Sequence, residues 1–119
     1  MPTCIRTAFA CALLTPAFAV LILALAPAAS AHMAPTGWMY DNYCCGGQDC
    51  QPIPTENVQI TPEGYVVSIP NGQHVTASRD HRKLFHYNEV RKSGDENFHG
   101  CILPNSQEFR CLYVPEFGA

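Results

Sequence analysis

The sequence predicts a small, mainly β domain, an antiparallel sheet fastened by disulfides with at most one short helical turn. Three observations predict it. Turn-forming Gly, Pro and Asn recur about every ten residues beyond residue 43. The runs between these turns are short and rich in β-branched and aromatic residues. Several cysteines lie among them, and a chain this short builds a limited core that often needs covalent staples.

The first 31 residues predict a signal peptide. Arg6 is their only charged side chain, an apolar run covers residues 8–26, and Ala29 and Ala31 are the small residues that a signal peptidase accepts. The favoured cut follows Ala31, and an uncleaved membrane anchor is the alternative. Removing 31 of the 119 residues leaves 88, a single domain from His32 to Ala119. We expect it to be periplasmic or secreted from a bacterium.

The mature segment is acidic, with 6 Lys and Arg against 10 Asp and Glu. This charge balance argues against a basic nucleic-acid binder, and the length excludes a multidomain enzyme or a polytopic membrane protein. Residues 79–83 form the main basic cluster and are interpreted as a solvated turn. No hydrolase, phosphate-binding or C-x-x-C redox motif is found, so we predict no catalytic residue and no enzyme.

Extended chain is expected in five runs, at residues 58–60, 65–69, 74–77, 98–103 and 109–114. The stretch from Ser78 to Lys92 is ambiguous. Ser78 and Asp80 suit a helix start, but the apolar residues that follow fit helical spacing only in part. We expect one helical turn over residues 78–83 and extended chain after it.

An odd number of cysteines remains after cleavage, because two of the seven lie in the leader: the others are Cys44, Cys45, Cys50, Cys101 and Cys111. In an oxidising compartment they are disulfide candidates, with one left unpaired or joining two chains in a disulfide-linked dimer.

A hairpin centred on Ser106 would set Cys101 opposite Cys111 on one face. These two could bridge each other, or both could bridge back to the N-terminal cysteines. We favour the second arrangement, whose longer loops are worth about 4 kcal/mol each in the chain-entropy model. Adjacent Cys44 and Cys45 project to opposite sides of an extended chain, and we expect Cys44 to be the free or intermolecular thiol. The predicted bridging set is then Cys45, Cys50, Cys101 and Cys111.

Several short motifs follow one another along the mature segment: Trp38-Met39-Tyr40, Cys44-Cys45, Asp49-Cys50-Gln51-Pro52, Gly64-Tyr65-Val66-Val67, His99-Gly100-Cys101 and Cys111-Leu112-Tyr113-Val114-Pro115. This order resembles small secreted Cys-rich bacterial proteins of unknown function, with a W-x-Y…CC…DC-x-P opening and a C-terminal H-x-C…C-x-x-x-P. Leu112 departs from the aromatic residue that is usual in them. The resemblance implies export and a disulfide framework, and it assigns no catalytic role.

The leading functional hypothesis is a non-enzymatic binding or structural module without a cofactor, for a protein or small-ligand partner that the sequence does not name. Trp38, Tyr40 and Tyr43 precede the double cysteine and are its candidate ligand surface. Packing of these rings over a disulfide is the structural alternative.

The second hypothesis is a periplasmic copper- or zinc-binding protein. Cleavage after Ala31 would make His32 an N-terminal residue whose amine and imidazole chelate a metal. His99 would be a further ligand, and the Cys/His cluster offers thiolates for zinc or copper.

Overall fold

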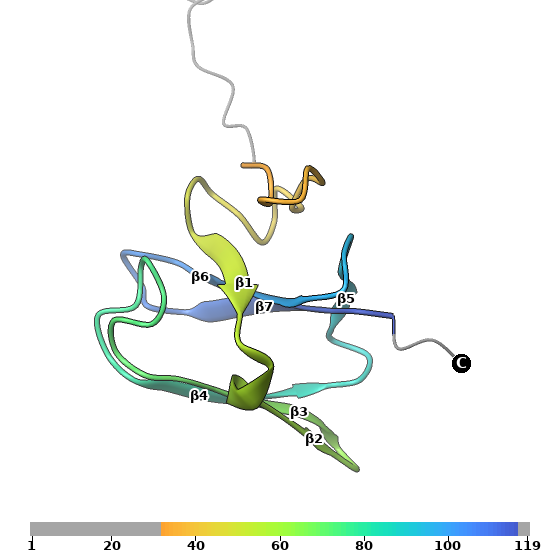
Figure 1. The fold of residues 1–119 in the computed structure, drawn as a ribbon. Helices are drawn as coiled ribbons and strands as arrows, with labels where there is room; N and C mark the ends of the chain where they lie inside the picture. Colours follow the sequence, from red (N-terminus) through yellow and green to blue (C-terminus); the bar gives the residue numbers. More distant parts are fainter. Residues whose placement is uncertain (1–31, 117–119) are drawn as a thin grey trace, which may run out of the picture.

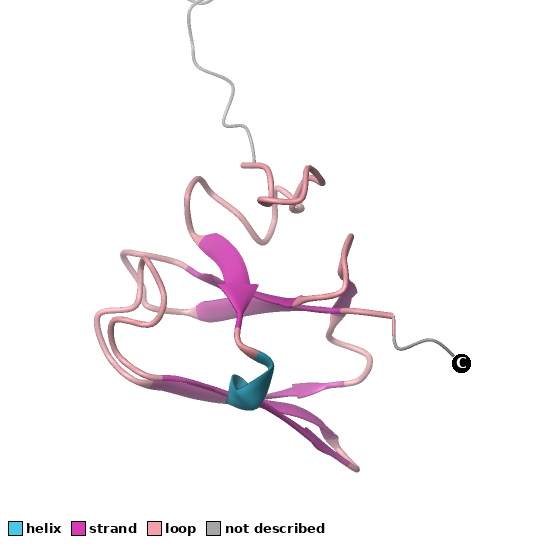
Figure 2. Cartoon of the chain, in the orientation of Figure 1, coloured by secondary structure: helices cyan, strands magenta, loops and turns pink. Residues whose placement is uncertain are grey.

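The computed structural model describes residues 32–116, so the predicted signal peptide and residues 117–119 lie outside the described part. The described chain is mainly β, as predicted (Figures 1 and 2). Its elements are β1 (Cys50–Ile53), the 3-10 turn η1 (Thr55–Asn57), β2 (Val58–Thr61), β3 (Gly64–Ile69), β4 (His81–His86), β5 (Arg91–Lys92), β6 (Phe98–Ile102) and β7 (Phe109–Val114). None of the helical structure in this part is long and apolar enough to cross a membrane.

The first sheet is the antiparallel meander β2-β3-β4. A tight turn at Pro62 and Glu63 joins β2 to β3, and Gly64 follows it with a φ of 147°. A Cβ at Gly64 would lie 2.1 Å from the carbonyl oxygen of Phe85 in β4. Only glycine therefore lets β4 approach β3 at this corner.

The second sheet has the order β1-β6-β7-β5, with β5 parallel to β7 and the other pairs antiparallel. In the β6–β7 hairpin Cys101 lies opposite Cys111, which confirms the predicted register. A bulge between Cys101 and Ile102 then shifts the pairing, so that Ile102 lies opposite Phe109. The shift keeps both apolar residues in the core, where each is almost fully buried.

Strand β6 is buried along its whole length, so this sheet is covered on both faces. One face packs on the β2-β3-β4 sheet. The apolar core between the sheets includes Val67, Ile69, Phe85, Ile102, Phe109 and Leu112. The other face carries the alternate residues of β6 and β7 and is covered by the segment of residues 33–49 rather than by a third sheet (Figure 1).

Two local predictions were wrong. The expected helical turn at residues 78–83 is absent: residues 78–80 end the β3–β4 loop and β4 starts at His81. Asp80 accepts a hydrogen bond from the backbone N–H of Asn71 (2.8 Å) and closes this loop. Pairing with β3 then outweighs the local helix signals. Residues 74–77, expected to be extended, form a turn in which the N–H of Ala77 donates to the carbonyl of His74 (3.1 Å).

Candidate functional site

The segment that covers the outer face of β6 and β7 begins with a short hairpin. Met33 and Met39 form an antiparallel bridge, and the N–H of Ala34 donates to the carbonyl of Trp38 (2.8 Å). Gly37 makes the reversal with a φ of 93°. Ala34 is buried on the sheet while both methionines are more than half exposed. The hairpin therefore has an apolar inner side and two thioethers in solvent.

Two disulfides join this segment to the β6–β7 hairpin: Cys44–Cys111 and Cys50–Cys101, with sequence separations of 67 and 51 residues. The prediction that Cys101 and Cys111 staple the N-terminal cysteines rather than each other is confirmed. Each closed loop is worth about 4 kcal/mol in the chain-entropy model. The two disulfides thus hold the segment of residues 33–49, which contains no regular strand, against the sheet.

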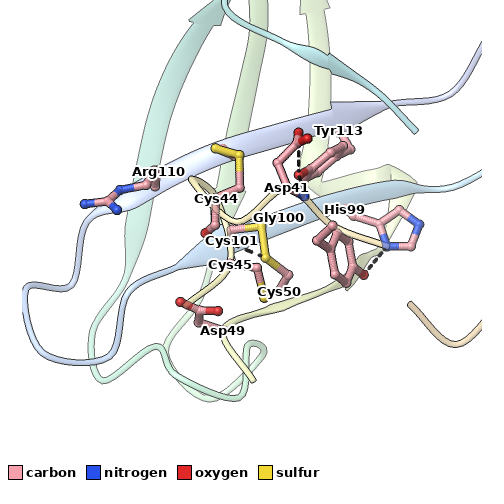
Figure 3. Close-up of a disulfide and its surroundings, with 12 residues drawn as sticks. Asp41, Cys44, Cys45, Asp49, Cys50, His99, Gly100, Cys101, Arg110 and Tyr113 are labelled. Atoms are coloured by element: carbon pink, nitrogen blue, oxygen red, sulfur yellow. Dashed lines mark hydrogen bonds between the residues drawn. A yellow bond between two sulfur atoms is a disulfide. The ribbon is translucent and has the colours of Figure 1, made fainter. Parts of the chain in front are cut away.

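The choice of unpaired cysteine was wrong: Cys44 is bridged, and Cys45 is the free thiol. The prediction assumed extended chain, but the N–H groups of Cys44 and Cys45 both donate to the carbonyl of Asp41, at 3.0 and 2.9 Å. This turn directs Cys44 at β7 and Cys45 away from it (Figure 3). The free thiol is only 2% exposed, so it is not placed to join two chains.

A partly buried hydrogen-bond network anchors the hairpin of residues 33–39 to the sheet. Asp95 accepts hydrogen bonds from Thr36, from the indole N–H of Trp38 (3.1 Å) and from Nε2 of His99 (2.8 Å). The hydroxyl of Tyr40 donates to Nδ1 of His99 (2.7 Å). Nε2 must donate, because a carboxylate only accepts. Both ring nitrogens of His99 are thus engaged, and this arrangement leaves neither for a metal.

The electrostatics of this network suit a fixed anchor. Burial opposes the ionisation of Asp95, but its hydrogen bonds, led by those from Thr36 and His99, outweigh burial and hold its pKa well below the usual value of 3.8. Burial, followed by the negative charge of Asp95, raises the pKa of Tyr40 well above its usual 10.0. Tyr40 therefore stays protonated and donates at every physiological pH.

Cys45 lies in a second polar cluster at the other end of the segment. Its Sγ lies 3.1 Å from Nδ1 of His32 and 3.1 Å from the carbonyl oxygen of Gly47. Asp49, 3% exposed, accepts from the backbone N–H groups of Gly46 (3.0 Å) and Gly47 (3.2 Å). Burial and the hydrogen bond to Asp49 raise the pKa of the Cys45 thiol, while hydrogen bonds from the thiol and backbone lower that of Asp49 against its burial.

The three aromatic residues predicted to form a ligand surface have different environments. Tyr40 is 2% exposed and packs edge-on to Trp38 and His99, so it is a packing residue. Trp38 is partly buried over Gly94, where a Cβ would lie 2.3 Å from the indole. Tyr43 alone of the three is on the surface, with 66% of its area exposed.

Around Tyr43, two guanidinium groups approach the ring. The Cζ atoms of Arg91 and Arg110 lie 5.7 and 5.3 Å from its centroid, within cation–π range. Arg91 also pairs with Asp41 (2.8 Å), and Arg110 with Glu108 (2.9 Å). Residues distant in sequence thus form one polar and aromatic patch.

Sequence reasoning missed Asp49 and Asp95 as the acceptors that organise the two clusters. The motif that contains Asp49 places it beside Cys50 but does not indicate that its carboxylate accepts from the N–H groups of Gly46 and Gly47. For Asp95, the four-residue spacing to His99 is no signal outside a helix. Two further partners, Thr36 and Trp38, lie almost sixty residues away.

Together the fold and the site define a small β protein whose N-terminal segment is held on a sheet by two disulfides. No family model matches the chain, and neither the curated proteins nor the solved structures include a significant match.

Proposed function

We propose that this protein is an exported, disulfide-stabilised binding module that recognises a protein partner through Tyr43 and its two flanking arginines. The observation that carries the proposal is an exposed tyrosine whose backbone is already fixed. Tyr43 directly precedes Cys44, which is bridged to β7, and its carbonyl accepts a hydrogen bond from Arg110 (3.3 Å).

Pre-organisation matters because binding immobilises side chains at a cost of about 0.5–1.5 kcal/mol each. At this patch the tyrosine ring already contacts Arg91 and Arg110, and both arginines are held by ion pairs. Tyr and Arg are the residue types most enriched among interface hot spots, and Met is enriched at interfaces generally. Met39, 53% exposed, lies four residues before Tyr43 and adds apolar surface to the same segment.

Export is supported by the leader-like residues 1–31 and by two disulfides, which persist in oxidising compartments. We propose the bacterial periplasm or the medium as the location. The intact mass of the protein recovered outside the cytoplasm tests this step. A chain beginning at His32 with two disulfides supports export and processing, and a full-length reduced chain found only in the cytoplasm contradicts both.

The binding proposal is tested by quantitative capture from the envelope fraction of the source bacterium, comparing wild type with Tyr43→Ser. We expect the captured partner to fall at least about tenfold, as for a hot-spot residue. Val75→Ser is the matched control, because Val75 is 70% exposed and its backbone N–H bond to Gln51 survives the change. Equal capture by Tyr43→Ser and Val75→Ser would exclude the Tyr43 patch as the binding surface. If wild type captures no partner in a saturable manner, the proposed binding function is excluded.

A further inference from the structure

We propose that His32, Cys45 and Asp49 bind one Zn(II) ion. The proposal starts from the only described cysteine outside a disulfide, which is buried beside an imidazole and a carboxylate. Asp49 and Cys45 have donor atoms within 4.8 Å of each other, and Cys50 belongs to the same group of potential ligands. Since the Cys50 sulfur is bonded to Cys101, it is not an available thiolate. His32 lies outside that 4.8 Å group but contacts the Cys45 sulfur through Nδ1 (3.1 Å), and it would supply the third donor by moving toward Asp49.

Nitrogen, thiolate sulfur and carboxylate oxygen form a donor set typical of zinc, whereas magnesium and calcium select oxygen alone. Zinc bonds of about 2.0 Å to nitrogen and about 2.3 Å to sulfur, at a tetrahedral angle, separate the two donor atoms by about 3.5 Å. His32 Nδ1 and Cys45 Sγ are 3.1 Å apart. For the His32–Cys45 pair, replacing the shared proton by zinc therefore needs a shift of only a few tenths of an ångström.

Two of the ligands are held in place before any ion binds. Cys45 is flanked by bridged Cys44, and Asp49 is followed by bridged Cys50. The Asp49 carboxylate also accepts two backbone hydrogen bonds, which orient it and leave lone pairs for a metal. Only His32, which is partly exposed, has to adjust.

The fourth ligand follows from the export proposed above. Cleavage after Ala31 would free the α-amine of His32, and this amine and Nδ1 of the same residue close a six-membered chelate ring. Nδ1, rather than Nε2, is the nitrogen that faces Cys45. The three side-chain ligands do not depend on cleavage. The zinc site can therefore exist even if the α-amine of His32 is not a ligand.

A thiol beside an imidazole also suggests a nucleophilic cysteine, but the carboxylate is on the wrong side for that assignment. In a Cys-His-Asp arrangement the acid orients the imidazole. Here the Asp49 carboxylate lies within 4.8 Å of the thiol sulfur itself. An imidazole and a carboxylate on either side of one thiol fit three ligands of a shared ion better than a proton relay.

The test uses the exported protein with Co(II) as a spectroscopic probe for Zn(II). We expect one Co(II) per chain, a thiolate-to-cobalt charge-transfer band, and displacement of Co(II) by Zn(II). Cys45→Ser should abolish the band, and His32→Gln and Asp49→Asn should each weaken Zn(II) binding at least about tenfold. His86→Gln, an exposed histidine, is the matched control and should bind as wild type does. Circular dichroism and the disulfide masses establish that each variant is folded.

An added residue before His32 separates the two parts of the proposal. It should remove the amine ligand and weaken binding, while leaving the charge-transfer band. Unchanged affinity would exclude the chelate only. The site itself is excluded if wild type binds no stoichiometric Co(II), if folded Cys45→Ser binds equally well, or if Cys45 is found bridged to Cys50 after disulfide exchange.

Discussion

The two faces of the β6–β7 hairpin are held by different forces. Toward the β2-β3-β4 sheet the face is apolar, with Ile102, Leu112 and Val114 in the core. Toward the N-terminal segment it carries His99, Cys101, Cys111 and Tyr113, which make disulfides and hydrogen bonds. The first face gains stability from buried area. The second face gains stability from disulfides and paired polar groups. It fixes the segment of residues 33–49, which contributes Tyr43, Cys45 and Asp49 to the two proposed sites.

The largest effect is expected from breaking the covalent face. The double variant Cys50→Ala/Cys101→Ala opens a loop of 51 residues. We expect the free energy of unfolding to fall by about 4 kcal/mol. Urea denaturation checks this, and a loss below about 1 kcal/mol would show that the bridge adds little to a segment already fixed by other contacts.

A slightly smaller loss is expected from the apolar face. Leu112 is fully buried between the sheets, and Leu112→Ala should cost about 3 kcal/mol through lost burial and a cavity. Denaturation under reducing and non-reducing conditions sharpens the comparison. Leu112→Ala should lower the free energy of unfolding by the same amount with and without reductant, because the apolar core does not contain the disulfides. A loss that vanishes on reduction would mean that the disulfides determine core packing.

The smallest of the three effects is a pH dependence specific to the anchoring network. The depressed pKa of Asp95 contributes stability that is complete above the unfolded value of 3.8 and is lost as the pH falls below it. Between pH 6 and pH 3 this loss is about 1 kcal/mol from Asp95 alone. Asp95→Asn should be less stable at pH 6 and should lack this part of the acid response. Equal acid sensitivity in both proteins would assign the loss to other groups.

The difference between the faces also decides what the sequence could predict. The extended runs at residues 98–103 and 109–114, and the symmetric placement of Cys101 and Cys111, report local strand geometry, and both predictions are confirmed. The choice between Cys44 and Cys45 depends on one backbone turn at Asp41, which the motif does not encode. The Asp95 anchor depends on contacts across almost sixty residues. Tertiary pairing likewise replaced the expected helical turn by β4.

Cysteine mapping of the exported protein tests the central claim most directly. The Tyr43 patch requires Cys44 to be bridged to β7, and the zinc site requires Cys45 to be free. Alkylation in denaturant without reductant, followed by proteolysis and mass spectrometry, identifies the bridges. We predict Cys44–Cys111 and Cys50–Cys101, with alkylation confined to Cys45. A bridge that includes Cys45, or a free Cys44, would contradict the account.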